Sequence, residues 1–359
     1  MLIGELVGTW RWRTDMKHRL GMAAAAGATC LALAVAGCAG GNGGGSSSGA
    51  GGGTADGTSV SVAFVPKIQG IPFFEAMNTG GADAAEEFGF NWVYSGPNTA
   101  DPAAQSEVVR SLMQQKVDAL LIAPNDPDSM APLITEAQDQ GIKVGTADTD
   151  ASSSSREVFV TQATEEAIGT ALLEQMAEPI DGEGQIAIVS CGQTAANLNA
   201  WIEVFKDKAA TDYPDMEIVD TVYADEDQAK AVTMAKNLIN AYPDLKGLVG
   251  VCTTSAPGVA QAVQESGKTG EIATVGVGTP QAMLPYLEDG SASSSVLWDV
   301  ENLGYLTAWA GWKLAQGESF EATQDVGRIP GVTYDEASQT LVMGEPLILT
   351  EENAGDYDY

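Results

Sequence analysis

From near residue 59 onward, short apolar runs alternate with helix-like segments, and this alternation limits the chain to a few classes of fold. The runs are rich in Val and Ile, and most segments between them carry apolar residues at helical spacing. Unbroken apolar strands that alternate with helices are typical of parallel sheets buried on both faces. The predicted strands are SVAFV, NWVYS, ALLIA and IKVGT, followed by IAIVS, IVDTV, GLVGV and IATVG.

The gap between IKVGT and IAIVS is longer than the others, so the strands divide into two sets of four. We therefore predict an α/β protein with two doubly wound lobes. Helix signals agree with this: Pro72 opens a segment with Phe74 and Met77 on its apolar face, and Asp101-Pro102 has the pattern of an N-cap and first turn. In such sheets ligands bind at the carboxyl ends of the strands, so two facing lobes would share a cleft.

Residues 1–37 have the features of a bacterial export signal. Four basic residues precede an apolar stretch of small residues that ends at Cys38. The segment resembles a lipoprotein signal, with VAGC as the lipobox and Cys38 as the acylated first residue. An uncleaved membrane anchor is the alternative, and whether translation starts at Met1 or Met16 stays open. Residues 38–57 are rich in Gly and Ser and are predicted to form a flexible tether. The folded body is thus expected at the outer face of the cytoplasmic membrane.

The charge balance narrows the range of partners. The chain has 17 basic and 49 acidic residues, a formal net charge of -32. Nucleic acids and anionic lipid headgroups are bound mainly by Lys and Arg, so such a chain repels both. A partner is expected to be neutral or cationic, or to be bound locally. Both a salty environment and colloidal solubility would account for this acidity.

Histidine usage argues against an enzyme. The only histidine, His18, lies in the predicted signal, so the exported chain would lack imidazole as a base, a nucleophile partner or a metal ligand. We expect no catalysis, no cofactor and no metal. Carboxylate pairs such as Asp126 with Asp128, or Asp148 with Asp150, fit caps and turns. A glycosidase that uses two carboxylates stays open as an alternative.

The stretch PKIQGIPFF holds the best candidate for a ligand site. Lys67 is the only Lys or Arg between Arg19 and Arg110, and it follows the first predicted strand directly. At this strand end it would face the cleft, where its ammonium could donate hydrogen bonds to ligand oxygens. Phe73 and Phe74 could cover the apolar face of a sugar ring. Alternatively, the two phenylalanines begin the core face of a helix and the lysine is a solvated loop cation.

Several strings, in order along the chain, carry a family resemblance: FVPKIQGIPFF, YSGPNTADPAAQ, DTD after IKVGTA, NLNAW, VGVGTP before MLPYLEDG, VLWDVENLGY and ENAGDYDY. From about residue 58 onward the chain resembles periplasmic sugar-binding proteins of the ribose type, and more closely the rhamnose-binding and autoinducer-2-binding receptors of ABC importers. The resemblance implies a monomer that captures a deoxyhexose such as rhamnose, a pentose or a polyol and delivers it to the transmembrane subunits of an ABC permease. Autoinducer-2 binding and a sensory role are the alternatives.

The resemblance also implies three chain crossings that form a hinge between the lobes. The first lobe would comprise residues 58–161 and 299–329. The second would comprise residues 162–298 and 330–359.

Matches to the family motifs suggest the ligand contacts. Lys67 and Asp148 match a lysine and an aspartate of the autoinducer-2 receptors, whereas Asn197-Leu198 departs from their Asp-Gln pair, which favours a sugar or polyol. Thr149 and Thr253 replace an arginine and an asparagine of the ribose type, which argues against ribose itself. Trp298 fits a ligand contact or hinge packing equally well. The predicted ligand-binding residues are Lys67, Phe73, Phe74, Asp148, Asn197, Thr253, Trp298 and Asp299.

Two cysteines lie in the folded body. Cys191 and Cys252 end the first and third strands of the second lobe, which are neighbours in a sheet of order 2-1-3. Neighbouring strands lie about 5 Å apart, which is within reach of a disulfide, and the compartment permits one. The sequence does not decide between a Cys191–Cys252 disulfide and two buried free thiols.

Overall fold

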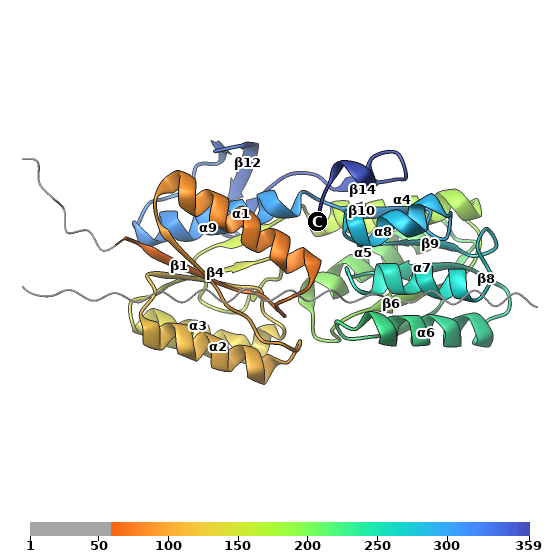
Figure 1. Cartoon of the computed structure of the whole chain (residues 1–359), viewed down its shortest axis with the longest axis horizontal. Helices are drawn as coiled ribbons and strands as arrows, with labels where there is room; N and C mark the ends of the chain where they lie inside the picture. Colours follow the sequence, from red (N-terminus) through yellow and green to blue (C-terminus); the bar gives the residue numbers. More distant parts are fainter. Residues whose placement is uncertain (1–58) are drawn as a thin grey trace, which may run out of the picture. The chain divides into compact units, whose positions relative to one another are not determined.

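Two sheets of mainly parallel strands organise the chain, which confirms the predicted fold class (Figure 1). The computed structural model describes residues 59–359, so the predicted signal, Cys38 and the whole of the predicted tether lie outside the described residues. Within this part of the chain no helix has both the length and the apolar character needed to cross a bilayer.

The first lobe is built on an eight-stranded sheet of order β11-β12-β13-β5-β4-β3-β1-β2. Its strands β1 to β5 are parallel, and β11 to β13 add an antiparallel extension at one edge. Its elements are β1 (Ser61–Val65), α1 (Pro72–Phe88), β2 (Asn91–Tyr94), α2 (Pro102–Gln115), β3 (Ala119–Ile122), α3 (Pro127–Asp139), β4 (Lys143–Ala147), β5 (Phe159–Thr161), α9 (Val300–Ala315), β11 (Thr323–Val326), β12 (Ile329–Asp335) and β13 (Thr340–Val342).

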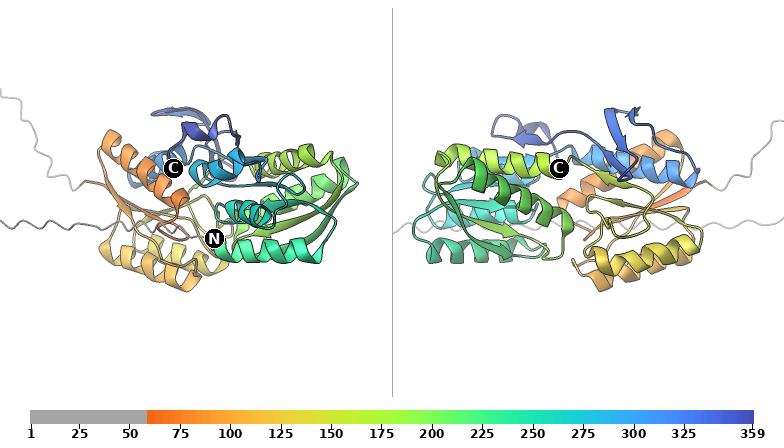
Figure 2. Two further views of the ribbon diagram at one scale, coloured as in Figure 1. Left: turned by 45° about the vertical axis from the view of Figure 1, so that its right-hand side comes forward. Right: turned by 180° about the vertical axis from the view of Figure 1, so that it is seen from behind.

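The second lobe has a six-stranded sheet of order β14-β10-β9-β8-β6-β7, parallel except for β14. Figures 1 and 2 show the two lobes side by side. Its elements are α4 (Glu165–Ala177), the short 3-10 helix η1 (Glu178–Ile180), β6 (Gly184–Ser190), α5 (Ala196–Asp212), β7 (Met216–Tyr223), α6 (Gln228–Ala241), β8 (Leu245–Gly250), α7 (Ser255–Glu265), β9 (Ala273–Gly276), α8 (Pro280–Glu288), β10 (Ser294–Leu297), β14 (Leu347–Leu349) and η2 (Ala354–Asp356).

Helices cover both faces of each sheet, as the buried parallel strands require. In the first lobe α1 and α9 pack on one face, and α2 and α3 on the other. The α1–α9 contact depends on two glycines, because a Cβ on Gly80 would overlap the backbone of Glu301, and one on Gly304 would overlap the backbone of Met77. Helix α1 begins at Pro72, and Asp101 caps α2 by accepting a hydrogen bond of 2.7 Å from Ala104 N, as predicted.

The chain crosses between the lobes three times, but the predicted third crossing near residue 330 is wrong. Strands β12 and β13 remain in the first sheet, where β13 pairs with β5 through Leu341 and Val160. The chain crosses only between β13 and β14, more than ten residues later than predicted. The reason is that β13 completes the edge of the first sheet by parallel pairing, and the short sequence TLV gives no local sign of that partner.

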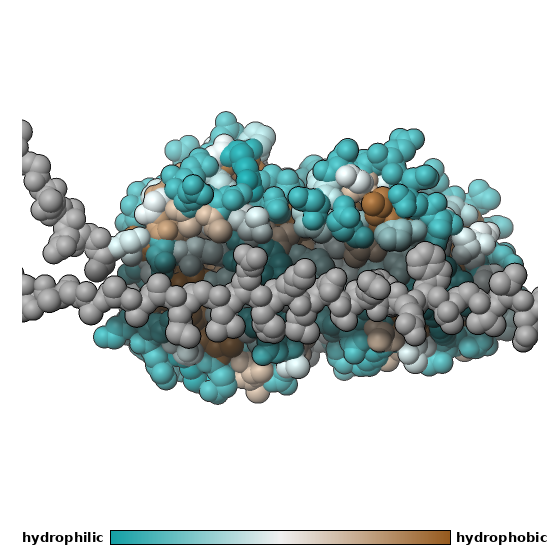
Figure 3. Space-filling view, in the orientation of Figure 1, coloured by the Kyte–Doolittle hydropathy of each residue, from teal (hydrophilic) through white to brown (hydrophobic). Residues whose placement is uncertain are grey.

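Hydrophilic side chains cover most of both lobes on the face shown in Figure 3. The apolar side chains are instead gathered in the interior, where one continuous cluster of buried residues includes β-strand and helix residues of both lobes. Trp298, at the crossing after β10, is part of this cluster and is only 1% exposed. The crossing is therefore packed into the core that the lobes share.

Candidate functional site

An interlobe cavity of about 30 Å³ collects seven of the eight predicted ligand-binding residues. Direct hydrogen bonds join the lobes beside it, from Lys67 Nζ to Asn197 Oδ1 and from Thr194 Oγ1 to the backbone oxygen of Asn125, so the two lobes are closed on each other around it. A larger groove of about 670 Å³ adjoins the cavity and shares Ile71, Glu226 and Thr253 with it. The predicted residues that line the cavity are Lys67, Phe73, Phe74, Asp148, Asn197, Thr253 and Trp298.

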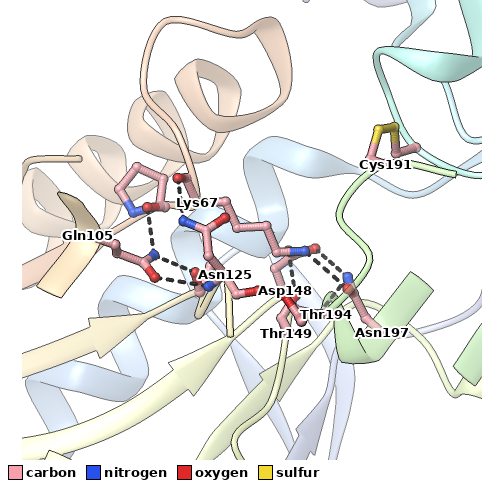
Figure 4. Close-up of polar contacts among 11 residues, drawn as sticks. Lys67, Gln105, Asn125, Asp148, Thr149, Cys191, Thr194 and Asn197 are labelled. Atoms are coloured by element: carbon pink, nitrogen blue, oxygen red, sulfur yellow. Dashed lines mark hydrogen bonds and ion pairs between the residues drawn. A yellow bond between two sulfur atoms is a disulfide. The ribbon is translucent and has the colours of Figure 1, made fainter. Parts of the chain in front are cut away.

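Lys67 is the central polar residue of the cavity and is only 4% exposed, which contradicts the alternative of a solvated loop cation. Its Nζ donates a hydrogen bond of 3.0 Å to Asn197 Oδ1 in the second lobe and lies 3.4 Å from Asp148 Oδ2 in the first. Figure 4 shows the ammonium extended towards these two partners. A buried ammonium group is tolerated only when it has hydrogen-bond and charge partners of this kind. The side chains of Lys67, Asp148 and Asn197 therefore form one polar unit across the cleft.

Two buried amides hold the loop that carries Lys67. Gln105 Nε2 donates to the backbone oxygens of Pro66 (3.0 Å) and Ala123 (2.7 Å), and its Oε1 accepts a hydrogen bond of 2.9 Å from Asn125 N. Asn125 Nδ2 in turn donates to the backbone oxygen of Lys67 at 2.8 Å (Figure 4). Sequence reasoning missed both amides, since a glutamine on a helix and an asparagine in a loop carry no local signal of burial.

Asp148 follows β4 and adopts the left-handed backbone conformation, with φ of 63°. This conformation is uncommon for residues other than glycine, although Asp and Asn tolerate it best. It places the carboxylate in the cavity, 4% exposed, beside the hydroxyl of Thr149, which donates to Oδ2 at 3.2 Å. Asp150 has a structural role instead, because it accepts hydrogen bonds from Arg156 at 2.7 Å and from Thr146 at 2.6 Å.

Four aromatic side chains form the apolar wall of the cavity. Phe73 makes edge contacts with Phe74 and Trp298, with ring centroids 5.0 Å and 5.8 Å apart. Trp298 also contacts Trp201 of α5, at 5.7 Å. Within the described residues Trp298 Nε1 has no hydrogen-bond partner, although it is buried. Trp298 therefore combines the two roles left open by the sequence: it packs at the hinge and it lines the cavity.

Asp299 is the one predicted ligand-binding residue that does not line the cavity. It is the N-cap of α9, where its carboxylate accepts hydrogen bonds from Asn302 N at 2.8 Å and Asn302 Nδ2 at 2.9 Å. Both oxygens are thus used in capping, which satisfies amides at the start of the helix. Asp299 thus caps a helix and does not line the cavity in this structure, and its contact with a ligand stays a prediction.

Glu226 is the principal cavity residue that sequence reasoning missed. It lies between β7 and α6 and lines both the cavity and the groove. Burial raises the pKa of Glu226 to about 7; Lys67 opposes this increase and Asp148 adds to it. A signal was present, since Glu226 comes shortly after a predicted strand, but it was hidden in the acidic run ADED.

The two cysteines of the second lobe are joined in a disulfide at the cavity wall. Their Cα atoms are 6.0 Å apart, and both residues are buried. Strands β6 and β8, which they follow, are paired neighbours as the predicted 2-1-3 order requires. The sulfur atoms and the Glu226 carboxylate lie within 4.8 Å of one another, but the bonded sulfurs offer no thiolate for a metal.

The two closed lobes, the three crossings and the interlobe cavity define a two-lobed binding protein. Comparison with protein families agrees: the chain belongs to the periplasmic binding protein domain family, whose model matches residues 62–319. Members of this class bind solutes outside the cytoplasm and are not enzymes. This excludes the glycosidase alternative, although the cavity does contain two carboxylates, Asp148 and Glu226.

Individual relatives share part of the sequence. A D-ribose/D-allose-binding protein from Pseudomonas aeruginosa is 28% identical over 242 residues, which cover 64% of this chain and 74% of that protein. A xylitol-binding protein from Mycolicibacterium smegmatis is 28% identical over 242 residues, 66% of each chain.

Solved structures extend the likeness over more of the chain. LsrB from Clostridium saccharobutylicum in complex with AI-2 has a TM-score of 0.80 and 25% identity, covering 84% of this chain and 100% of that one. An ABC transporter solute-binding protein from Clostridium phytofermentas with bound L-rhamnose has a TM-score of 0.78 and 26% identity, covering 84% and 98%.

Proposed function

We propose that this protein captures a small sugar or polyol outside the cytoplasm and delivers it to the membrane subunits of an ABC importer. The observation that supports this most strongly is the buried unit of Lys67, Asp148 and Asn197, set against an aromatic wall in one interlobe cavity. Charged and amide groups bind ligand hydroxyls, and aromatic faces cover the apolar side of a sugar ring. The sugars and the polyol named for several relatives support the same class of ligand.

Binding in this cavity requires a hinge motion. The lobes are joined across the cavity by the hydrogen bond from Lys67 Nζ to Asn197 Oδ1, so a ligand enters when the lobes move apart. Its hydroxyls then take the place of the direct Lys67–Asn197 hydrogen bond, which joins the lobes in this structure. The ligand thus supplies the differential affinity that stabilises the closed form.

A deoxyhexose such as rhamnose, a pentose or a polyol is the proposed cargo. Leu198 supports a sugar over AI-2, because it places an apolar side chain in the cavity beside Asn197, where the AI-2 receptors have a polar pair. Trp298 favours a ligand with an apolar face or an acceptor oxygen, since its buried Nε1 has no partner within residues 59–359.

A thermal-shift screen of the chain from residue 54 onward tests this proposal. The panel comprises L-rhamnose, D-ribose, D-allose, D-arabinose, xylitol and AI-2. A ligand at about 100 times its Kd adds roughly 2.7 kcal/mol to the free energy of unfolding, so one or more sugars should raise the Tm measurably. A shift with AI-2 alone would contradict the sugar assignment, and no shift with any compound would contradict the proposed ligand class.

We also propose that Cys38 carries the lipid that holds the protein at the membrane surface; it lies outside the described residues, and the support is the signal and lipobox sequence. Cys38→Ala should therefore move the protein from the membrane fraction to the soluble fraction, as measured by immunoblotting of fractionated cells. Cys30→Ala, in the apolar stretch of the signal, is the matched control and should stay with the membrane. A Cys38→Ala protein that also stays with the membrane would contradict lipidation at this residue.

A further inference from the structure

Glu226 occupies a position that the proposed function leaves unassigned. It lies at the carboxyl end of β7, the strand next to β6 in the second sheet. Its side chain lines the cavity on one side and the open groove on the other. A ligand that reaches from the cavity towards the groove would therefore pass this carboxylate.

The carboxylates on either side of Glu226 have structural partners. Asp225 is paired with the ammonium of Lys230 at 2.6 Å. Asp227 is the N-cap of α6 and accepts a hydrogen bond of 3.0 Å from Lys230 N. Glu226, between them, forms no ion pair with any residue of the described chain 59–359. Of the three successive carboxylates, it alone lines the cavity, where its protein neighbour is the hydroxyl of Thr254.

The groups that face Glu226 do not neutralise it. From the first lobe it faces Lys67 and Asp148, and Lys67 is already held by Asp148 at 3.4 Å and by Asn197 at 3.0 Å. From the second lobe it faces the hydroxyl of Thr254 and the adjacent Asp225. Among the charged residues that line the cavity there are thus two carboxylates and one ammonium.

We propose that Glu226 is a further specificity-determining contact, which accepts a hydrogen bond from a hydroxyl or ammonium group of the bound ligand. This inference rests on the proposed sugar-binding function and adds a donor requirement to it. Glu226 is half-buried, and a bound ligand would cover it further; a covered carboxylate is costly to leave without a donor, so the site should discriminate against analogues that lack a donor group at this point. An ammonium would also balance the excess negative charge of the cavity.

The proposal predicts that binding is linked to the ionisation of Glu226. Burial raises its pKa to about 7 in the structure, so the carboxyl is largely protonated at pH 6 and largely ionised at pH 8. A donor group on the ligand favours the ionised form and lowers this pKa in the complex, so binding releases a proton below about pH 7. Affinity should accordingly increase with pH up to about 7 and then level off.

Calorimetric titration of the full chain at pH 6 and pH 8 tests this, with the highest-affinity compound of L-rhamnose, D-ribose, D-allose, D-arabinose and xylitol as the probe. Wild type should bind about tenfold more tightly at pH 8 than at pH 6, since one proton is exchanged. Glu226→Gln should lose about tenfold or more in affinity at pH 8 and lose the pH dependence. Asp225→Asn, the matched control one residue away, should retain both, because its carboxylate bonds Lys230 instead.

Titration with an amino-deoxy analogue of the probe distinguishes the two donors. Tighter binding of the amine to wild type, but not to Glu226→Gln, would identify an ammonium as the preferred donor; tighter binding of the neutral sugar would identify a hydroxyl. Sugar binding that is equal in wild type and Glu226→Gln, or that weakens as the pH rises, would overturn the role of Glu226 while the proposed function stands. No binding by any of these compounds would overturn both.

Discussion

Asp148→Asn should reduce the affinity for the best ligand of the panel by roughly 100-fold, because removal of one partner from a buried charge pair costs several kcal/mol. Asparagine is the appropriate replacement, since it tolerates the left-handed conformation of residue 148 and keeps the shape of the side chain. The substitution removes the acceptor for ligand hydroxyls and leaves the Lys67 ammonium buried without its counter-ion. Isothermal titration calorimetry of the variant against wild type measures the loss.

A second variant separates binding from folding. Asp148→Asn should also lower the free energy of unfolding by about 3 kcal/mol, the typical cost of an uncompensated buried charge. Lys67→Met in the same chain removes that charge, so the double variant should regain most of the stability in urea denaturation but none of the binding. Normal ligand affinity in Asp148→Asn would show that this carboxylate does not contact the ligand.

Loss of the Cys191–Cys252 disulfide should have the largest effect on stability. The bond joins residues 61 positions apart, and cross-linking a loop of this length stabilises a protein by about 4 kcal/mol through the unfolded chain. It also fixes the ends of β6 and β8, where Cys252 lines the cavity. Cys191→Ala/Cys252→Ala should therefore unfold at a clearly lower urea concentration than wild type.

Reduction provides the control for this comparison. A reductant should destabilise wild type to about the level of the double variant and leave the double variant unchanged. Alkylation of the unfolded, unreduced chain should add no mass at Cys191 or Cys252. Alkylation at both cysteines without reduction, together with a reductant-independent Tm, would instead show two free thiols.

The rule that ligands bind at the carboxyl ends of parallel strands located most of the site from the sequence. Asp148 directly follows β4, Lys67 comes two residues after the end of β1, and Asn197 lies in the second position of α5, after the loop from β6. Phe73 and Phe74 came from the same stretch as Lys67, and the family resemblance added Asn197, Thr253 and Trp298. These residues meet in one cavity because neighbouring strand ends are brought to the same edge by the doubly wound topology.

Features that depend on distant partners were not predictable in this way. Strands β5 and β10 are only three and four residues long, and their pairing comes from neighbours in the sheet rather than from a local pattern. The same applies to β13: because this strand pairs with β5 in the first sheet, the third crossing comes after Val342 and not at the predicted position. Local sequence does not show which sheet such short segments join.

Sequence motifs did not identify the roles of two residues, Asp299 and Glu226. Asp299 was assigned from its position in a family string, but an aspartate that precedes a helix is also a suitable N-cap, and here that role uses its carboxylate. Glu226 was overlooked because one acidic residue in a chain with 49 of them attracts little notice. Only the structure distinguishes it from Asp225 and Asp227, whose carboxylates have partners.

A crystal structure of the chain with the best ligand of the panel would show whether the interlobe cavity is the binding site. We predict electron density for one ligand between the lobes, with its oxygens within hydrogen-bond distance of Lys67, Asp148 and Asn197 and a ring face against the aromatic wall. Density for the ligand on the outer surface of either lobe, with the Lys67–Asn197 hydrogen bond unchanged, would contradict the assignment of the cavity as the binding site.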